Sequence, residues 1–359
     1  TVGLATAGYS IYIFTDENQL ASNIGKVCES LVEESPMKHV LRSRLCNELF
    51  VTLKMIKEPW PCSPAIFFDL YESAMLSGDI ENAMMCRFNH CCGLFRLGLL
   101  DLSSVSKYVA VCIKETAKYK QNTMLYSTMG VLNSCSQLSG IMTATDDFDL
   151  KSSDELQEMG EKTNNVFLTW QSFIQRMIDH FWKREFMVVA DLSKKFSEKH
   201  PSSPPKRILQ VMRCFFEGIA YLNIARDTRQ IKWRILGEKA VIQISENVSM
   251  MSEWNFKNKS LLLWAELHYL DGDIKSADAS YRASIKSAHD HKFLHEEALG
   301  LELYGFFLVE NKMAVEGMHQ LQLAIDKYTE WGAIKKAGSV KEFSDMVGEY
   351  LIPKEHLSV

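Results

Sequence analysis

The feature that most constrains this fold is a helical hairpin that recurs along the chain. Between residues 261 and 328, apolar residues follow helical spacing in four runs. Short polar breaks separate the runs within each pair, at Asp271-Gly272-Asp273 and at Glu310-Asn311-Lys312. Connections of about three to five residues join antiparallel neighbours in helical proteins. The stretch therefore predicts two consecutive helical hairpins.

The two hairpins repeat each other at a fixed distance in the sequence. Ala265 and Gly305 are 40 residues apart, and so are Ala277 and Gly317. Small residues at these places let two helix backbones approach closely. Bulky residues at later turns, such as Tyr281, then fill the space between the helices.

An earlier copy of the same hinge occurs near the N-terminus. The shared positions are Gly78, Asp79 and Ala83 in the first copy and Gly272, Asp273 and Ala277 in the second. The glycine is expected to take the positive φ that ends one helix. The aspartate is expected to cap the next helix and to complement its dipole. The alanine begins the buried face of that second helix.

Most of the remaining sequence also follows helical spacing. Further helices are expected at about 17–34, 38–56, 82–99, 103–120, 122–141, 165–182, 184–199, 205–225 and 231–251, and one at 1–15, where Tyr9–Phe14 is also strand-like. Only 18 Gly and 8 Pro occur in 359 residues, too few for the turns of a β-rich chain. We therefore predict an all-α, tetratricopeptide-like solenoid, a right-handed superhelix of antiparallel hairpins in which each unit buries its face against its neighbours.

Three segments are expected along this array. Residues 1–142 form an N-terminal half, 143–164 an exposed acidic insertion, and 165–359 a C-terminal half that continues the same array. Because the sequence starts at Thr1, we expect a fragment of a larger chain. Trp331 and Gly332 mark the end of a long helix near the C-terminus, and Trp264 and Trp331 are expected in the core.

Composition limits the classes of partner and the compartment. The net charge of −5 offers no field that would concentrate the chain on nucleic acid. The nine cysteines are odd in number and lie mostly in apolar runs, which favours free thiols in a reducing compartment. No membrane-spanning run and no signal peptide are visible. We expect a cytoplasmic protein without a nucleic-acid or membrane partner.

Two clusters of chemically reactive side chains could each be either a functional site or part of the ordinary structure. Cys86 and His90 share a helix face next to Cys91 and Cys92, but no paired metal-ligand spacing accompanies them. Core cysteines beside an ordinary histidine are the favoured interpretation, so no metal is predicted. No phosphate loop or nucleophile elbow occurs either, and we predict no cofactor and no catalytic residues.

A second cluster of charged side chains follows at 289–302. Glu296, Glu297 and Glu302 could act as paired carboxylates, and His295 belongs to a group of three histidines. Because nothing in the sequence indicates a cleft, we expect a solvated helix face and solvated histidines.

The C-terminal segments together resemble a known type of repeat region. The residues that carry the likeness are Trp254–Lys259, Ala265-Glu266, Gly272-Asp273, Ala277, Tyr281, His291–Phe293, Glu296–Leu299, Glu302-Leu303, Trp331–Ala333 and Lys336. They resemble the tetratricopeptide-like helical region that follows the AAA-type ATPase module in large signal-transduction proteins with sensor histidine kinases. Lys57–Pro59 and the hinge at 78–83 fit the same layout.

The resemblance implies a scaffold rather than an enzyme. It predicts a regulatory module that binds a protein or another domain on its concave surface and links an ATPase to an output domain in signal transduction. The alternative is an α-helical small-ligand sensor or enzyme with a pocket between the two halves of the chain. That alternative predicts polar residues that converge in a buried cavity.

Overall fold

The computed structural model describes residues 1–15, 17–141, 149–200 and 207–351. All regular elements in these ranges are helices, which confirms the all-α prediction. In chain order they are α1 (Val2–Phe14), α2 (Asn18–Glu33), α3 (Lys38–Arg44), η1 (Cys46–Leu53), η2 (Lys54–Ile56), η3 (Trp60–Cys62), α4 (Ser63–Ser77), α5 (Ile80–Arg96), α6 (Leu102–Lys118), α7 (Asn122–Ser139), α8 (Ser153–Lys162), α9 (Val166–Trp182), α10 (Phe186–Lys199), α11 (Arg207–Thr228), α12 (Ile231–Met250), α13 (Glu253–Asp271), α14 (Ile274–Asp290), α15 (Leu294–Glu310), α16 (Ala314–Glu330) and α17 (Ile334–Leu351). No described helix has both the length and the apolar composition needed to cross a lipid bilayer.

The repeated hinge has the same backbone geometry in both copies. Gly78 and Gly272 end α4 and α13 at φ values of 75° and 77°, in the left-handed region that favours glycine. The next residue caps the following helix in each copy. Asp79 accepts a hydrogen bond from the backbone N–H of Asn82 at 3.2 Å, and Asp273 accepts one from that of Ser276 at 3.0 Å. The turn chemistry of the sequence therefore produces the hairpins directly.

The closest approach of two helices within a hairpin is at Gly305 and Gly317. A Cβ atom at Gly305 would lie 2.7 Å from Cγ of Leu321, and one at Gly317 would lie 2.9 Å from the carbonyl oxygen of Gly305. Ala265 and Ala277 are fully buried in the preceding hairpin. The side chain of Tyr281 fills that interface and donates a hydrogen bond to Glu266 Oε1 at 2.5 Å.

The expected single helix at 38–56 is interrupted in the structure. Helix α3 ends at Arg44, and η1 continues as a π-helical segment with wider turns. Buried apolar residues recur here every four residues, at Leu45, Leu49 and Leu53.

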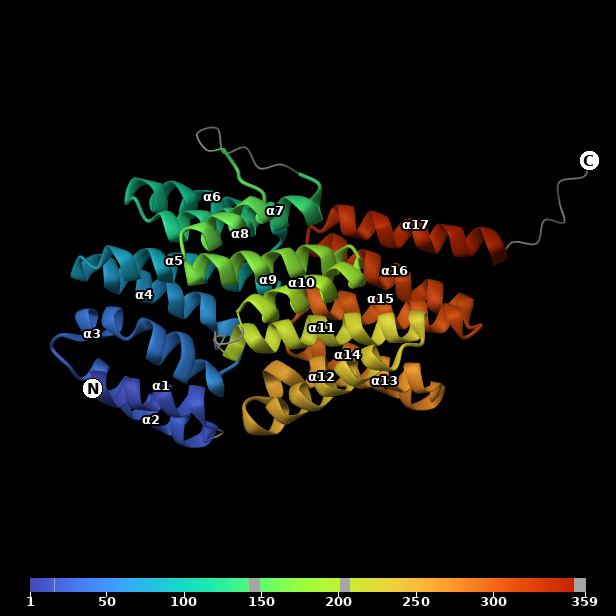
Figure 1. The fold of residues 1–359 in the computed structure, drawn as a ribbon, viewed down its shortest axis with the longest axis horizontal. Coiled ribbons are helices and arrows are strands. Elements are labelled where there is room, and N and C mark those ends of the chain that lie inside the picture. The colour runs from blue at the N-terminus through green and yellow to red at the C-terminus, as the bar shows by residue number, and fades with distance from the viewer. Residues whose placement is uncertain (16, 142–148, 201–206, 352–359) are drawn as a thin grey trace, which may run out of the picture.

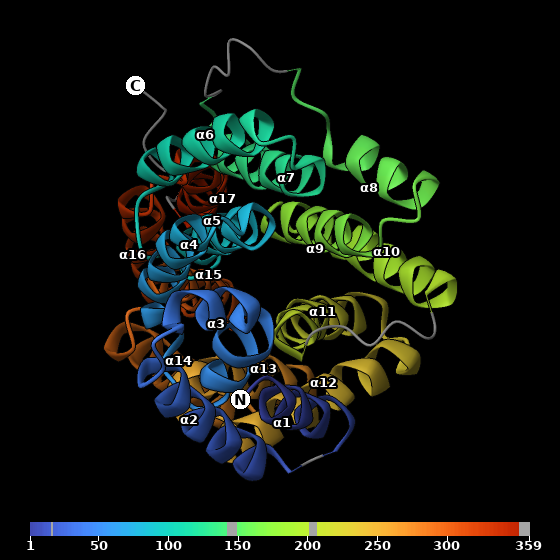
Figure 2. The same cartoon turned by 90° about the vertical axis from the view of Figure 1, so that its left-hand side faces the viewer.

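The hairpins follow a curved path that brings distant parts of the chain together. Seen end-on, α1 to α12 form a ring, and α13 to α17 continue behind it (Figure 2). The side view shows the later helices beside the earlier ones along the long axis (Figure 1). The array is therefore a superhelix in which the second turn lies on the first. Its handedness stays a prediction.

Contacts between the two turns join residues about 195 to 230 positions apart in the sequence. Asn255 accepts a hydrogen bond from the backbone N–H of Trp60 at 2.8 Å and donates one to the carbonyl of Glu58 at 2.8 Å. Further along, Leu102 N–H donates to the carbonyl oxygen of Trp331 at 2.8 Å. The expectation that each unit buries itself only against its neighbours is therefore wrong, because successive turns also pack together.

The acidic segment at 143–164 differs from the expectation of an exposed insertion. Residues 142–148 lie outside the described part of the chain. Residues 153–162 form helix α8, which Ser152 and Glu155 cap reciprocally and which packs against α9 through Leu156, 1% exposed. Asp154, Glu155 and Glu158 are exposed, while the helix itself belongs to the array.

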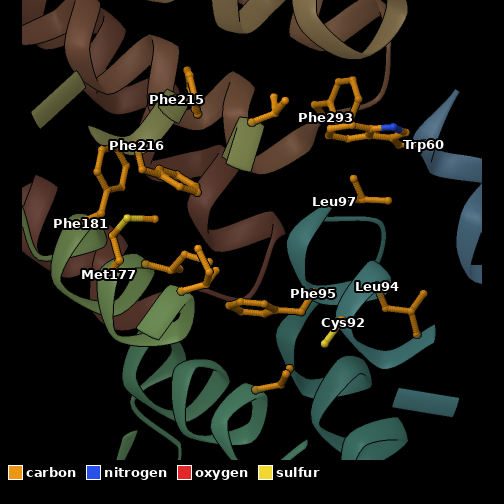
Figure 3. Packing of buried hydrophobic residues seen from close by; sticks show 14 of the residues in the cluster. Trp60, Cys92, Leu94, Phe95, Leu97, Met177, Phe181, Phe215, Phe216 and Phe293 are labelled. Atoms are coloured by element: carbon orange, nitrogen blue, oxygen red, sulfur yellow. The ribbon is translucent and has the colours of Figure 1, made fainter. Parts of the chain in front are cut away.

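The core runs through both turns of the superhelix. Figure 3 shows Trp60 next to Phe293, with Phe95, Leu97 and the aromatic residues of α9 and α11 nearby. Trp331 lies in this core, as expected, 1% exposed, and Gly332 follows it at a φ of 80°. Trp264 does not, because it is 37% exposed and stacks on His268.

Candidate functional site

A cavity of about 110 Å³ lies inside the first turn of the superhelix. It is partly open, and residues from both halves of the chain form its wall. These residues are Tyr12, Val51, Thr52, Met55, Trp60, Ser63, Phe67, Asn89, Cys92, Gly93, Arg96, Leu97, Phe167, Gln171 and Met212. The wall is mostly apolar, with a few polar groups, which is the usual composition of a small-ligand site.

Helix α5 provides the polar side of this cavity. Asn89, Gly93 and Arg96 follow one another at i, i+4 and i+7, so they share one face of the helix. Gly93 lies where α4 crosses α5, and a Cβ atom there would be 3.0 Å from Cγ of Pro64. The glycine thus permits the close packing of the two helices and leaves the floor between Asn89 and Arg96 without a side chain.

Arg96 is held in place by a single side-chain partner. Its Nη2 donates a hydrogen bond to Oε1 of Gln171 on α9, at 2.8 Å. Its Nε is buried and has no hydrogen-bond partner in the described part of the chain. No ion pair with a described carboxylate accompanies these contacts. A guanidinium therefore borders a mainly apolar cavity without a counter-charge.

Two other arginines with little exposed side chain are paired with carboxylates. Nε of Arg87 lies 3.0 Å from Oε2 of Glu115, and Nη1 of Arg226 lies 3.0 Å from Oε2 of Glu266. Such pairing is the rule for buried charges, because an isolated charge is costly to remove from water. Arg96 is partly exposed and has no such carboxylate partner among the described residues where it borders the cavity.

The glutamates at 296–302 are buried, which corrects the expectation of a solvated helix face. The exposed fractions are 7% for Glu296, 8% for Glu297 and 0% for Glu302. Glu302 accepts hydrogen bonds from Lys336 Nζ at 2.7 Å and from the Tyr328 hydroxyl at 2.6 Å. Burial would raise the pKa of Glu302, but Lys336, Arg184 and the hydrogen bonds outweigh it and hold the pKa below its ordinary value. This glutamate links α15, α16 and α17 as a structural anion.

A similar ion pair joins α13 to α15. Lys259 Nζ lies 2.7 Å from Oε2 of Glu296, which also accepts a hydrogen bond from Asn258. The neighbouring His295 is buried rather than solvated, and burial lowers its pKa to about 4. It packs against Gly98, where a Cβ atom would lie 2.5 Å from Nδ1 of the histidine. The ion pair thus joins two helices of the second turn, and His295 packs the second turn against the first.

Among the described residues, the Cys86 and His90 cluster is part of the packed core. His90 Nδ1 lies 2.8 Å from the carbonyl oxygen of Pro64, and Cys86, Cys91 and Cys92 are buried free thiols. Burial raises the pKa of the Cys92 thiol to about 11, so this thiol is a poor nucleophile. Among the residues that the structure describes, no three His, Cys, Asp or Glu side chains are arranged to hold a metal ion.

A second cavity of about 160 Å³ lies where α17 meets α7 and α9. Asp179, Lys335 and Lys336 are part of its wall. Burial raises the pKa of Asp179 to about 7, against hydrogen bonds from Ser134 and Gln137. Because Lys336 is already paired with a glutamate and Lys335 is exposed, this cavity has less defined chemistry than the first.

The chain matches no known protein-family model and no curated protein sequence. The first cavity is therefore the feature of the structure from which a function can be inferred. The sequence predicted no ligand site here, and of the wall residues it drew attention to Cys92 as a core thiol. The signal that could have found them is the face of α5 on which Asn89, Gly93 and Arg96 follow one another at helical spacing.

Proposed function

We propose that this chain is a non-catalytic helical-repeat module that binds a protein segment or a neighbouring domain at the inner face of its superhelix. In this role it serves as a regulatory scaffold within a multidomain ATPase and kinase signalling protein, as the sequence resemblance implies. Helical solenoids commonly bind their partners along such concave surfaces.

One observation carries this proposal. The first cavity, which we call the inner cavity from here on, is lined by residues between 12 and 97 of the N-terminal half and between 167 and 212 of the C-terminal half. An occupant of the cavity contacts both halves at once, and its binding energy depends on how they are placed. Such dependence is what a regulatory module requires, because a ligand shifts a conformational equilibrium only through different affinities for its states.

A peptide-display selection on the purified chain tests the proposal. Asn89→Phe places a large side chain in the cavity, whereas Glu81→Phe places the same side chain on the exposed first turn of α5. Selected peptides should bind at least about tenfold more weakly to Asn89→Phe and normally to Glu81→Phe, since a blocked pocket loses its anchor. Equal binding to both variants contradicts a partner at the inner face. Tight ATP binding by the chain contradicts the scaffold function itself.

The cavity also favours a second function, that of a small-ligand receptor. The polar groups of Asn89, Arg96 and Gln171 converge on one apolar cavity between the two halves. This is the arrangement that a sensor pocket between the halves requires. A dye or small apolar probe that binds wild type and is excluded by Asn89→Phe supports this second function, and failure of all small probes contradicts it.

A further inference from the structure

The charge at Arg96 restricts which ligands the inner cavity can accept. Arg96 is partly exposed, but its Nε is buried without a hydrogen-bond partner and no described carboxylate pairs with the guanidinium. An anion that enters the cavity can supply the missing partner through charge-assisted hydrogen bonds. One guanidinium faces the cavity, and no other cationic side chain contributes to its described wall. Within the described wall, this one guanidinium matches a ligand with a single negative charge.

The geometry around Arg96 favours a planar anion. The guanidinium presents a fork of donors that matches a carboxylate in two hydrogen bonds. Gln171 takes one Nη2 donor of Arg96, and this bond holds the group toward α9. Arg96 and Asn89 both line the cavity from one face of α5, with Gly93 between them. The Asn89 amide, which also lines the cavity, can add a further hydrogen bond.

The rest of the wall determines the body of the ligand. Trp60, Phe67, Phe167 and Met212 offer apolar surface and no charge. The volume of about 110 Å³ is somewhat smaller than the roughly 150 Å³ of an engineered apolar cavity that binds benzene. A single ring or a short aliphatic chain fits such a space, while a long acyl chain does not.

From these observations we infer that the inner cavity binds a small monocarboxylic acid, with its carboxylate on Arg96 and Asn89 and its apolar body among the aromatic residues of the wall. This inference rests on the receptor function proposed above and names its ligand class.

Calorimetry on the full chain with matched probes tests the inference. The probes are benzoate and hexanoate, their neutral counterparts benzamide and 1-hexanol, and acetate as an anion without a body. Benzoate or hexanoate should bind at least about tenfold more tightly than its neutral counterpart, because a charge-assisted hydrogen bond is lost in the latter. Acetate should bind more weakly than either, because it lacks the apolar body.

Two variants and one control assign the effect to the cavity. Arg96→Gln should weaken carboxylate binding by about ten- to a hundredfold and leave the neutral probes unchanged. Arg234→Gln removes the same charge from a surface arginine that is paired with Glu238, and it should not change the affinity. If Arg96→Gln lowers stability, Asn89→Leu keeps the test decisive, because no hydrogen bond of its side chain to a described residue is lost.

Each outcome bears on a separate statement. Carboxylate binding that is lost in Arg96→Gln and kept in Arg234→Gln supports the inference. Equal binding of charged and neutral probes, or no effect of Arg96→Gln, overturns carboxylate recognition and leaves the receptor function standing. No binding of any probe overturns both, while the peptide selection still judges the scaffold function independently.

Discussion

The contact between α15 and α16 allows a sharp test of the packing argument. In Gly317→Ala, the new Cβ would lie 2.7 Å from Cγ2 of Val309, 2.9 Å from the carbonyl oxygen of Gly305 and 3.0 Å from the backbone nitrogen of Val309. Two of these three atoms belong to the backbone of α15, so a side-chain rotation cannot remove the overlap. The two helices must move apart by a few tenths of an ångström.

The size of the effect follows from two opposing contributions. Overpacking of a close interface costs about 1–3 kcal/mol. Alanine is favoured over glycine inside a helix by about 1 kcal/mol. Gly317→Ala should therefore lower the free energy of unfolding by up to about 2 kcal/mol. Gly338 on α17 has no atom within 4 Å of a new Cβ, so Gly338→Ala should raise that free energy by about 1 kcal/mol.

Urea denaturation followed by far-UV circular dichroism measures both variants. Because the helix preference is common to both, the difference between them, about 1–3 kcal/mol, isolates the steric contribution. An equal rise in stability for the two variants would refute the reasoning. It would show that α15 and α16 are further apart than the structure indicates.

Three further predictions concern buried charges and caps. Lys336→Met should lower the free energy of unfolding by about 3–5 kcal/mol in urea denaturation, because a fully buried carboxylate loses its ammonium partner. Burial raises the pKa of Asp179 from 3.8 to about 7, so the folded state binds this proton more tightly than the unfolded state does. The stabilisation that results from the protonated Asp179 is complete below pH 3.8 and is lost as the pH rises to 7. Asp179→Asn should remove about 4 kcal/mol of that decline, seen as a flatter pH dependence between pH 4 and 7. Asp273→Ala should cost about 1 kcal/mol as a lost cap, and Asp79→Ala should lower the thermal midpoint further, because Asp79 also accepts a hydrogen bond from buried Ser43 at 2.6 Å.

The hairpins could be predicted because their determinants are local. Gly272 and Asp273 fix the turn within a few residues, and Gly305 and Gly317 mark a contact between consecutive helices. The burial of Glu302 could not be predicted in this way. Its partners Lys336 and Arg184 lie 34 and 118 residues away, so no window of sequence shows that the charge is compensated.

The path of the superhelix depends on the summed rotations between successive hairpins rather than on any single contact. Each hairpin turns slightly relative to the one before it, and the second turn meets the first only if these rotations add up correctly. In the structure the second turn meets the first after about 195 residues, where Asn255 contacts Trp60 and His295 contacts Gly98. The inner cavity is a product of the same sum, because its walls come from helices that no local pattern connects. A small error in the rotation per hairpin would leave every predicted helix in place and still remove the cavity. For this reason the hairpins can be predicted from the sequence, while the site at Arg96 can be recognised only in the three-dimensional structure.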